Sequence, residues 1–373
     1  MSAPKSAPVL AGTLVLDFST VLPGPLATLI LAQAGARVVK VERPGAGDPM
    51  REYDPKLGLD SVNFALLNRG KESLALDLST AEGRRALEPW LARADVLVEQ
   101  FRPGAMDRLG LGYEAVRRVN RGIVYCSITG YGQCGPLAQK AGHDLNYMAE
   151  TGCLGLVADR QGNPSLPPVP IADIAGGTYP AVINILLALM RRRETGEGSR
   201  VDIAMSENVF ALLYWARGEG FSAGRWPLPG EGLIAGRTPR YRIYGTADGR
   251  HLAVAALEDR FWREFCEAIE LEPVLRDDAI DPGATGARVA EIIAARSAAD
   301  WDQALAGKDV CCSVVARVEE AVANPHFVAS GLFERSVTRD GRSIPALPLP
   351  LSASFDAGEP ALGYPLIDEH AAL

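Results

Sequence analysis

Two short stretches place titratable side chains at the starts of apolar segments, where they could move protons. Ala141-Gly-His-Asp-Leu-Asn-Tyr147 carries His143 and Asp144 just before a predicted helix. Pro170-Ile-Ala-Asp-Ile-Ala-Gly-Gly177 carries Asp173 on the first turn of the most apolar predicted helix. The partial positive charge of a helix N-terminus favours an ionised Asp and a neutral His. Both stretches are therefore predicted to supply proton acceptors near neutral pH.

Each of these side chains also has a purely structural interpretation. A histidine before a helix is often only a capping residue, and Asp144 and Asp173 could each be a plain N-cap. The Gly176-Gly177 pair favours a site, because paired glycines cost helix stability unless something approaches the backbone closely. The stiff approach Leu166-Pro-Pro-Val-Pro170 would hold the carboxylate of Asp173 still.

Strand and helix patterns alternate through the first part of the chain and predict a parallel sheet. Strands are expected at residues 13–18, 36–42, 73–78, 94–99, 122–129 and 200–204, and helices at 26–34, 81–92, 113–119, 145–150, 173–193 and 205–215. A dinucleotide site on the first unit is excluded, because the prolines of Val21-Leu-Pro-Gly-Pro25 remove amide donors that a pyrophosphate needs. Gly130-Tyr-Gly-Gln-Cys-Gly135 matches a GxGxxG pattern, but Pro136 follows it and a turn is predicted.

Changes in composition and in hydrophobic pattern divide the chain into four parts. Residues 1–217 are expected to form a large domain, and residues 218–240, rich in Gly and Pro, a linker or active-site loop. Residues 241–329 are predicted to be a small α+β domain with two strands joined at Asp248-Gly249 and helices at 259–270 and 289–305. Residues 330–373 are proline-rich and are expected to lie extended on a surface.

The composition excludes several classes of protein. A formal charge of −8 argues against a nucleic-acid partner. The first eight residues lack an export signal and the six cysteines lack framework spacing, so a cytoplasmic setting is expected. The apolar run 181–190 is about half of a bilayer span and predicts a buried helix, with no membrane partner. The four histidines lack the spacing of metal ligands, and no metal is expected.

Basic residues gather near the expected strand ends, where they fit a phosphate-bearing ligand. They are Lys40, Arg43, Arg51, Arg69, Lys71, Arg102 and Arg108.

Several of these motifs together resemble the family III CoA-transferase superfamily of the CaiB/BaiF type, closest to its α-methylacyl-CoA racemase branch. The resemblance covers about residues 10–370 and rests on the two stretches above and on three more: Phe101-Arg-Pro-Gly104, Thr195-Gly-Glu-Gly-Ser-Arg-Val-Asp202 with Met205 and Glu207, and Thr246-Ala-Asp-Gly-Arg-His-Leu-Ala-Val-Ala-Ala-Leu-Glu258. It implies an α/β fold: a large domain with a Rossmann-like parallel sheet, a smaller α+β domain, and a C-terminal segment returning to the large domain. It also implies an interlocked homodimer with each active site between one chain's large domain and the other's small domain.

The resemblance also implies roles for particular residues. His143, paired with Glu258, and Asp173 resemble the racemase's two opposed proton carriers. Three arginines fall where the family holds the phosphates of CoA: Arg43, Arg102 and Arg108. The resemblance also places Asp144 and Tyr147 against the substrate. Coenzyme A would be part of the thioester substrate, with no separate cofactor.

Two reactions follow from these assignments. The first is epimerisation at the α-carbon of a 2-methyl-branched acyl-CoA by two bases, with His143 and Glu258 on one face and Asp173 on the other. The alternative is CoA transfer between carboxylic acids through an acyl-enzyme at Asp173. The presence of all three groups favours epimerisation, although Ala235-Gly-Arg-Thr-Pro239 departs from the Gly-Gly-Ala-Pro of racemases.

Overall fold

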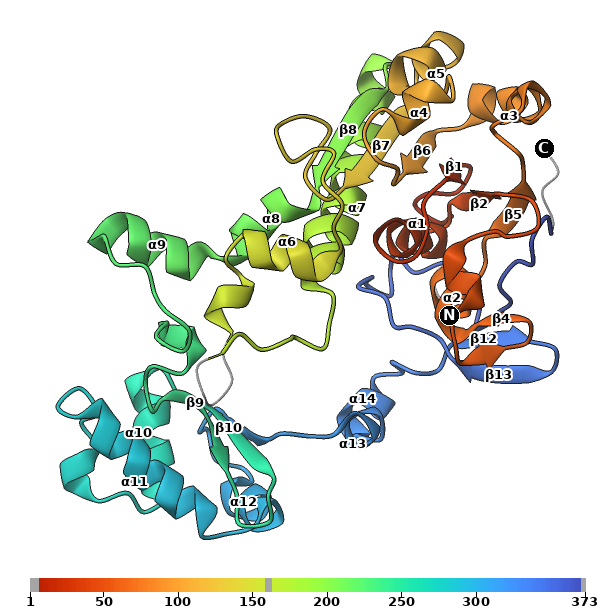
Figure 1. Ribbon diagram of the computed structural model, residues 1–373. Helices are drawn as coiled ribbons and strands as arrows, with labels where there is room; N and C mark the ends of the chain where they lie inside the picture. Colours follow the sequence, from red (N-terminus) through yellow and green to blue (C-terminus); the bar gives the residue numbers. More distant parts are fainter. Residues whose placement is uncertain (1–6, 158–162, 370–373) are drawn as a thin grey trace. The chain divides into compact units, whose positions relative to one another are not determined.

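The computed structural model describes residues 7–157 and 163–369, which form two compact units (Figure 1). Unit 1 groups Met1–Thr151, Pro168–Leu212 and Pro325–Leu373, and unit 2 groups Gly152–Pro167 and Leu213–Asn324. The first six residues, part of the stretch predicted to carry no export signal, lie outside the described residues.

Unit 1 is built on a six-stranded parallel sheet in the order β5-β2-β1-β6-β7-β8. Its strands are β1 (Leu14–Asp17), β2 (Arg37–Glu42), β5 (Glu72–Ala75), β6 (Val96–Glu99), β7 (Val124–Thr129) and β8 (Ser199–Ala204). Its main helices are α1 (Pro23–Gln33), α2 (Val62–Asn68), α3 (Ala81–Arg93), α4 (Ala105–Arg108), α5 (Tyr113–Val119), α6 (Asp144–Glu150), the π-helix η3 (Ala172–Thr178), α7 (Tyr179–Thr195) and α8 (Met205–Leu212). The predicted α/β class with a parallel sheet is confirmed.

Helices cover both faces of this sheet. Successive side chains of β1 point to opposite faces, and each meets a helix there. Leu16 points into a buried cluster with Leu87 and Trp90 of α3. Asp17 points to the opposite face, where its carboxylate accepts a hydrogen bond from the Thr28 hydroxyl of α1. The carboxyl ends of the parallel strands therefore meet at one edge, where the connecting loops can build a site.

Helix α7 is only half buried, which corrects the expectation of a fully buried helix. Ala181 and Ile185 are buried, whereas Ile183, Leu187 and Met190 are 56%, 58% and 62% exposed. The continuous helical stretch Ala172–Thr195 is long and apolar enough to span a membrane by length and composition alone, and 39% of its most apolar part is buried.

Unit 2 has its own antiparallel sheet, in the order β11-β10-β9, and its own core. Its elements are α9 (Tyr214–Ala223), β9 (Tyr241–Gly245), β10 (His251–Ala255), α10 (Asp259–Ala268), α11 (Pro282–Ala294), α12 (Ala298–Leu305), β11 (Cys312–Val314) and α13 (Val318–Val322). Trp262, Phe265 and Trp301 are buried in the cluster that joins these helices to the sheet.

Three sequence expectations are corrected by the structure. The helix expected at 289–305 is two helices, because Ser297 caps a new one: its hydroxyl accepts the amide hydrogen of Asp300. The expected linker begins inside α9, which ends only at Gly224, a residue with φ of 66°. The first helix begins at Pro23 rather than at 26, since proline is well tolerated in a first helical turn.

The proline-rich C-terminal stretch is a further correction, because it contributes to the core of unit 1. After α14 (Pro325–Ala329) it forms β12 (Ser336–Arg339), β13 (Arg342–Pro345) and β14 (Ala361–Leu362). Val337 and Tyr364 are buried with residues of α1 and α2, and Leu347 packs against the same cluster. Alternating leucines between the prolines supply the apolar contacts that a surface segment would not need.

Candidate active site

The two predicted bases line one pocket of about 470 Å³ at the carboxyl edge of the sheet in unit 1. His143 stands at the start of α6, and Asp173 lies in η3. The rest of the wall comes from loops that follow β1, β6 and β7, and from the start of α8. Its members are Thr20, Val21, Pro23, Gln100, Phe101, Arg102, Pro103, Ile128, Thr129, Gly130, Ala138, Lys140, Ala141, Gly142, Asn146, Tyr147 and Met205.

Asp173 is less acidic than the helix-terminus argument predicts. Burial raises the pKa of its carboxyl to about 6, the nearby Asp144 carboxylate adds to the rise, and His143 opposes it. Desolvation therefore outweighs the field of the helix start. The carboxyl is still mostly ionised at neutral pH, and its pKa lies close to the range in which general bases work.

The structural interpretation made Asp144 the N-cap of its own helix, but the structure shows a different role. His143 is the N-cap of α6, and the Asn146 side chain accepts the His143 amide hydrogen at 3.0 Å. The Asp144 carboxylate instead accepts the backbone N–H of Asp173 at 3.0 Å. Asp144 thus fixes the backbone that carries Asp173 and raises the pKa of its side chain.

The Gly176-Gly177 pair allows η3 to lie directly against the start of α8. A Cβ at Gly176 would come within 2.5 Å of the Met205 carbonyl oxygen. A Cβ at Gly177 would come within 3.1 Å of Pro23 and 3.0 Å of the Met205 side chain. The inference that something approaches this backbone closely is correct, and what approaches is the protein itself.

Tyr147 is a buried member of the pocket wall and lies near Asp173. Its hydroxyl donates to the Gly142 carbonyl oxygen at 2.5 Å, and its ring meets that of Tyr131 edge to face. Burial, with Asp173 next in effect, raises its pKa to about 12. Tyr147 therefore stays protonated near neutral pH and holds the loop that precedes His143.

We expect Asp144→Asn to move the acid limb of the kcat/KM profile to lower pH. As a proton acceptor Asp173 must be ionised, so activity should fall as the pH drops through about 6. Removing the Asp144 charge lowers the pKa of Asp173, while the asparagine oxygen still accepts its N–H. Measuring kcat/KM from pH 4.5 to 8 tests this, and a shift to higher pH would contradict it.

The start of α1 offers no amide donors to a phosphate. Pro23 and Pro25 have no N–H, and the N–H of Gly24 donates to the Gln100 side-chain oxygen at 3.1 Å. The GxGxxG stretch 130–135 is irregular, and the next helix after it begins only at Asp144. The turn predicted for residues 130–135 is confirmed, and the argument against a dinucleotide-type pyrophosphate site stays a prediction.

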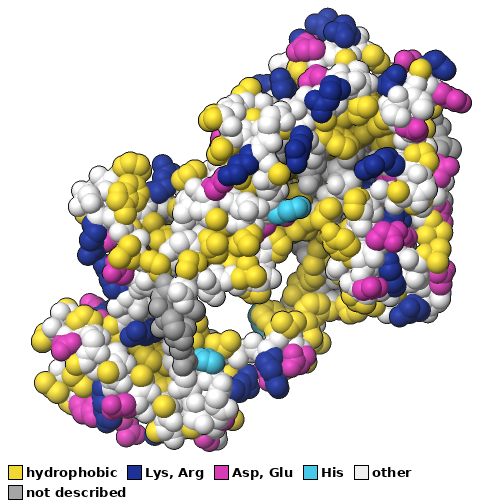
Figure 2. Space-filling model, in the orientation of Figure 1, with side chains coloured by type: hydrophobic (Ala, Val, Ile, Leu, Met, Phe, Trp, Pro, Cys, Tyr) yellow, Lys and Arg dark blue, Asp and Glu magenta, His cyan; other side chains and the backbone are white. Residues whose placement is uncertain are grey.

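Four of the seven clustered basic residues are buried in unit 1, where they bind other side chains of the protein. Lys40 pairs with Asp48 at 2.9 Å, Lys71 with Asp17 at 3.0 Å, and Arg51 with Glu42 at 2.7 Å. The remaining one, Arg69, is 3% exposed and donates to Gln33. On the molecular face in Figure 2, basic and acidic side chains are both scattered over the surface.

The three arginines assigned to CoA phosphates are all exposed. Arg43 lines a second pocket of about 280 Å³, and Arg102 lines the pocket of His143 and Asp173. Thr20 and Phe101 belong to both walls, so the two pockets adjoin. Arg108 ends α4, four residues after Gly104. The exposed guanidinium groups of Arg43 and Arg102, beside adjoining pockets, suit an extended, phosphate-bearing ligand, whereas Arg108 lines neither of these two pockets.

Glu258 lies in unit 2, where it is the exposed N-cap of α10. Its pairing with His143 stays a prediction. Its side chain makes no capping hydrogen bond, although a negative charge at this position is favourable at the start of α10.

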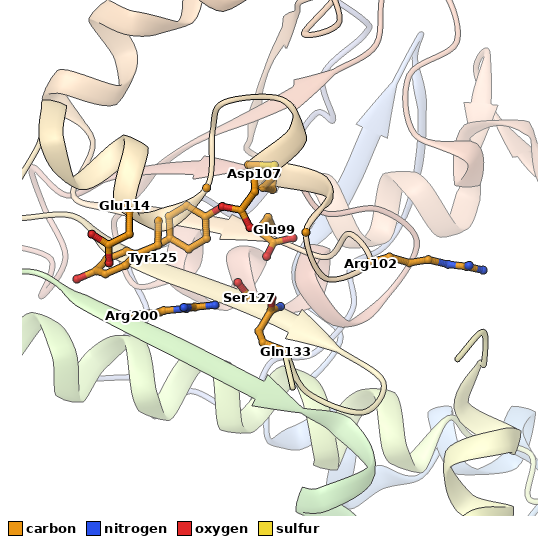
Figure 3. Close-up of a pocket in the computed structure, with 12 residues that line it drawn as sticks. Glu99, Arg102, Asp107, Glu114, Tyr125, Ser127, Gln133 and Arg200 are labelled. Atoms are coloured by element: carbon orange, nitrogen blue, oxygen red, sulfur yellow. The ribbon is translucent and has the colours of Figure 1, made fainter. Parts of the chain in front are cut away.

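Glu99 is a buried carboxyl that the sequence reasoning did not single out. It is 4% exposed at the end of β6, and burial raises its pKa to about 7 despite hydrogen bonds from Ser127 and from the Phe101 N–H at 2.8 Å. It lines a small pocket of about 60 Å³, from which the Arg102 side chain extends away (Figure 3). Glu99 holds the turn that brings Phe101 and Arg102 to the larger pocket. Its signal in the sequence was an acid ending a buried strand.

Comparisons with known proteins agree with this architecture. A family model described as CoA-transferase family III matches residues 10–371. The human alpha-methylacyl-CoA racemase is 34% identical over 369 residues, covering 97% of this chain and 91% of that protein. The acetyl-CoA:oxalate CoA-transferase of Acetobacter aceti is 31% identical over 372 residues, covering 97% and 93%.

The fold is also found among solved structures. A crystal structure of a CAIB/BAIF family protein from Brucella suis aligns with a TM-score of 0.84 at 28% identity, covering 98% of each chain. Racemases and CoA-transferases thus match this chain at similar identity, and the choice between the two reactions depends on the site.

Proposed function

The chain belongs to CoA-transferase family III, and from that premise we propose that it is an acyl-CoA epimerase that inverts the α-carbon of a 2-methyl-branched thioester. The observation that carries the proposal is that His143 and Asp173 line the same pocket. Inversion needs two proton carriers that reach opposite faces of one carbon. A pocket with an imidazole and a half-buried carboxyl supplies both.

The proposed reaction moves one proton off and one proton on. The thioester carbonyl acidifies the α-hydrogen, one of the two side chains takes that proton, and the electron pair moves into an enolate. The other side chain then gives a proton to the opposite face, so no other bond changes. Each positioned acid or base contributes about 10²–10⁴-fold. The reverse conversion uses the same two side chains in exchanged roles, and the starting protonation state returns when they exchange protons with water.

The enolate oxygen needs a hydrogen-bond donor, and backbone N–H groups at a helix start are one possible source. The N–H of Asp173 donates to Asp144, and that of Gly24 donates to Gln100. The Thr129 hydroxyl is a better candidate, because it lines the pocket, is 6% exposed and has no hydrogen-bond partner among the described residues. A buried hydroxyl without a partner is costly unless a ligand satisfies it.

The second candidate is CoA transfer, which the transferase relatives favour. The Asp173 carboxylate would attack the thioester carbonyl and expel the CoA thiolate, leaving a mixed anhydride. The thiolate would then attack the aspartyl carbonyl, releasing the first acid and leaving an aspartyl-CoA thioester for the second acid. This sequence uses Asp173 and does not need His143.

A homodimer is part of the proposal. The exposed apolar face of α7, formed by Ile183, Leu187 and Met190, suits a second copy of the chain. In the proposed assembly Glu258 of one chain pairs with His143 of the other.

Deuterium exchange separates the two reactions. A 2-methylacyl-CoA of one configuration is incubated with the protein in D₂O, with and without a free carboxylic acid, and followed by mass and by chiral analysis. Epimerisation predicts inverted product carrying one deuterium, with no acid required. Retention of configuration and of hydrogen, with CoA moved to the added acid, would instead establish transfer.

A further inference from the structure

The loop between β1 and α1 contains a backbone conformation that its residue disfavours. Val21 has φ of 64°, in the left-handed region, although it is β-branched. Such residues are rare outliers, because the Cβ substituents clash with the backbone. Val21 lines the pocket of His143 and Asp173. Backbone strain of this kind persists only where surrounding contacts enforce it.

The enforcing contact comes from Asp48. Both carboxylate oxygens of Asp48 accept the N–H of Val21, at 3.2 Å each. Asp48 is itself paired with Lys40 at 2.9 Å, and both side chains are 0% exposed. Lys40 also donates to the Ser19 carbonyl oxygen at 2.7 Å. One buried ion pair thus holds the loop at two points, two residues apart.

This loop separates two pockets. Thr20, between the two tethered residues, lines both the pocket of Arg43 and that of His143 and Asp173. An acyl-CoA that places phosphates near Arg43 and its thioester near Asp173 must pass over Thr20 and Val21. This step rests on the proposed function.

We propose that Asp48, charged and fixed by Lys40, is a positioning residue that holds Val21 in its left-handed conformation and so sets where the thioester lies. Asp48 acts through the Val21 backbone rather than by touching the reacting atoms. Small misplacements of a reacting group can reduce turnover about a hundredfold, so the effect falls on kcat more than on KM.

The test is a double-mutant cycle between Asp48 and Val21. Asp48→Ala is expected to lower kcat about ten- to a hundredfold, and the milder Asp48→Asn, which keeps an acceptor oxygen but loses the charge, less. Val21→Gly removes the steric conflict, because glycine adopts positive φ freely. In the Val21→Gly background either Asp48 substitution should therefore lower kcat less than about threefold.

Two controls make the cycle specific. Val21→Ala removes the same side chain but keeps a Cβ, so it should not rescue Asp48→Ala. Asp60→Asn breaks a different ion pair, with Arg51 at 2.9 Å, and should cost the same in both Val21 backgrounds. Equal losses from Asp48→Ala with Val21 and with Val21→Gly would overturn the proposal, since a direct contact with CoA or a general loss of stability gives that result.

The cycle is also read by thermal unfolding without substrate. Asp48→Asn should lower the melting temperature less in the Val21→Gly background than in the wild type. In the Val21→Ala background the decrease should be as large as in the wild type. If the protein neither exchanges the α-proton nor transfers CoA, only the proposed function is contradicted. The unfolding measurements would still report the coupling between Asp48 and Val21. Active protein with no coupling in either measurement would defeat the positioning role alone.

Discussion

Replacing Asp173 with alanine is expected to lower turnover of an acyl-CoA by about 10²–10⁴-fold, because both proposed reactions need this carboxylate. In epimerisation the α-proton can still exchange from the His143 face, so deuterium enters with retention and inversion is lost. Asp173→Asn serves as the matched control, since it keeps the size of the side chain and removes the base. Wild-type inversion by either variant would refute the assignment.

The partner measurement on His143 decides between the mechanisms. His143→Ala is expected to abolish inversion while leaving the Asp173 face able to exchange its proton. In CoA transfer the same variant keeps most of its activity, and hydroxylamine attacks the activated Asp173 carbonyl, expels the acid or the CoA thiolate, and leaves a hydroxamate on Asp173. Intact inversion by His143→Ala would exclude the two-base mechanism.

Co-expression of Glu258→Gln and Asp173→Ala chains is expected to restore about one active site per heterodimer, although each homodimer is inactive. Asp173 lies in unit 1 and Glu258 in unit 2. When each site combines unit 1 of one chain with unit 2 of the other, one of the two heterodimer sites contains both intact residues.

Differently tagged chains allow the heterodimer to be purified and its kcat compared with that of the wild type. The chains are made together, because an interlocked dimer should not exchange once folded. A folded heterodimer without activity would mean that Asp173 and Glu258 must come from the same chain.

The parallel sheet and the two pocket residues His143 and Asp173 could be predicted, because both predictions depend on local sequence. Apolar runs set the strands, and residues at the starts of segments after parallel strands meet at one edge. His143 and Asp173 were predicted from their places at the starts of apolar segments, and the argument against a phosphate site at Val21-Leu-Pro-Gly-Pro25 came from prolines, which lack an N–H. The close approach at Gly176 was predicted from glycine chemistry, although the sequence did not indicate its partner.

Contacts between residues distant in the sequence could not be predicted. The pattern does not indicate that Lys71 is paired with Asp17, 54 residues away, so Lys71 was grouped with the basic residues that fit a phosphate-bearing ligand. Asp144 was interpreted as a local cap, although its carboxylate binds a backbone N–H 29 residues on. The raised pKa of Asp173 likewise depends on burial, which a helix-terminus argument omits.

The contact between Gly176 of η3 and Met205 of α8 is made by main-chain atoms, and this limits how the site can diverge. A wall formed by side chains can be moved gradually by exchanging large residues for small ones, whereas a glycine against a carbonyl oxygen leaves no smaller residue to choose. We therefore expect the carboxyl of Asp173 to keep its depth wherever this glycine is retained. A different ligand would then be accommodated by other parts of the wall, such as Phe101, whose volume can change without displacing η3.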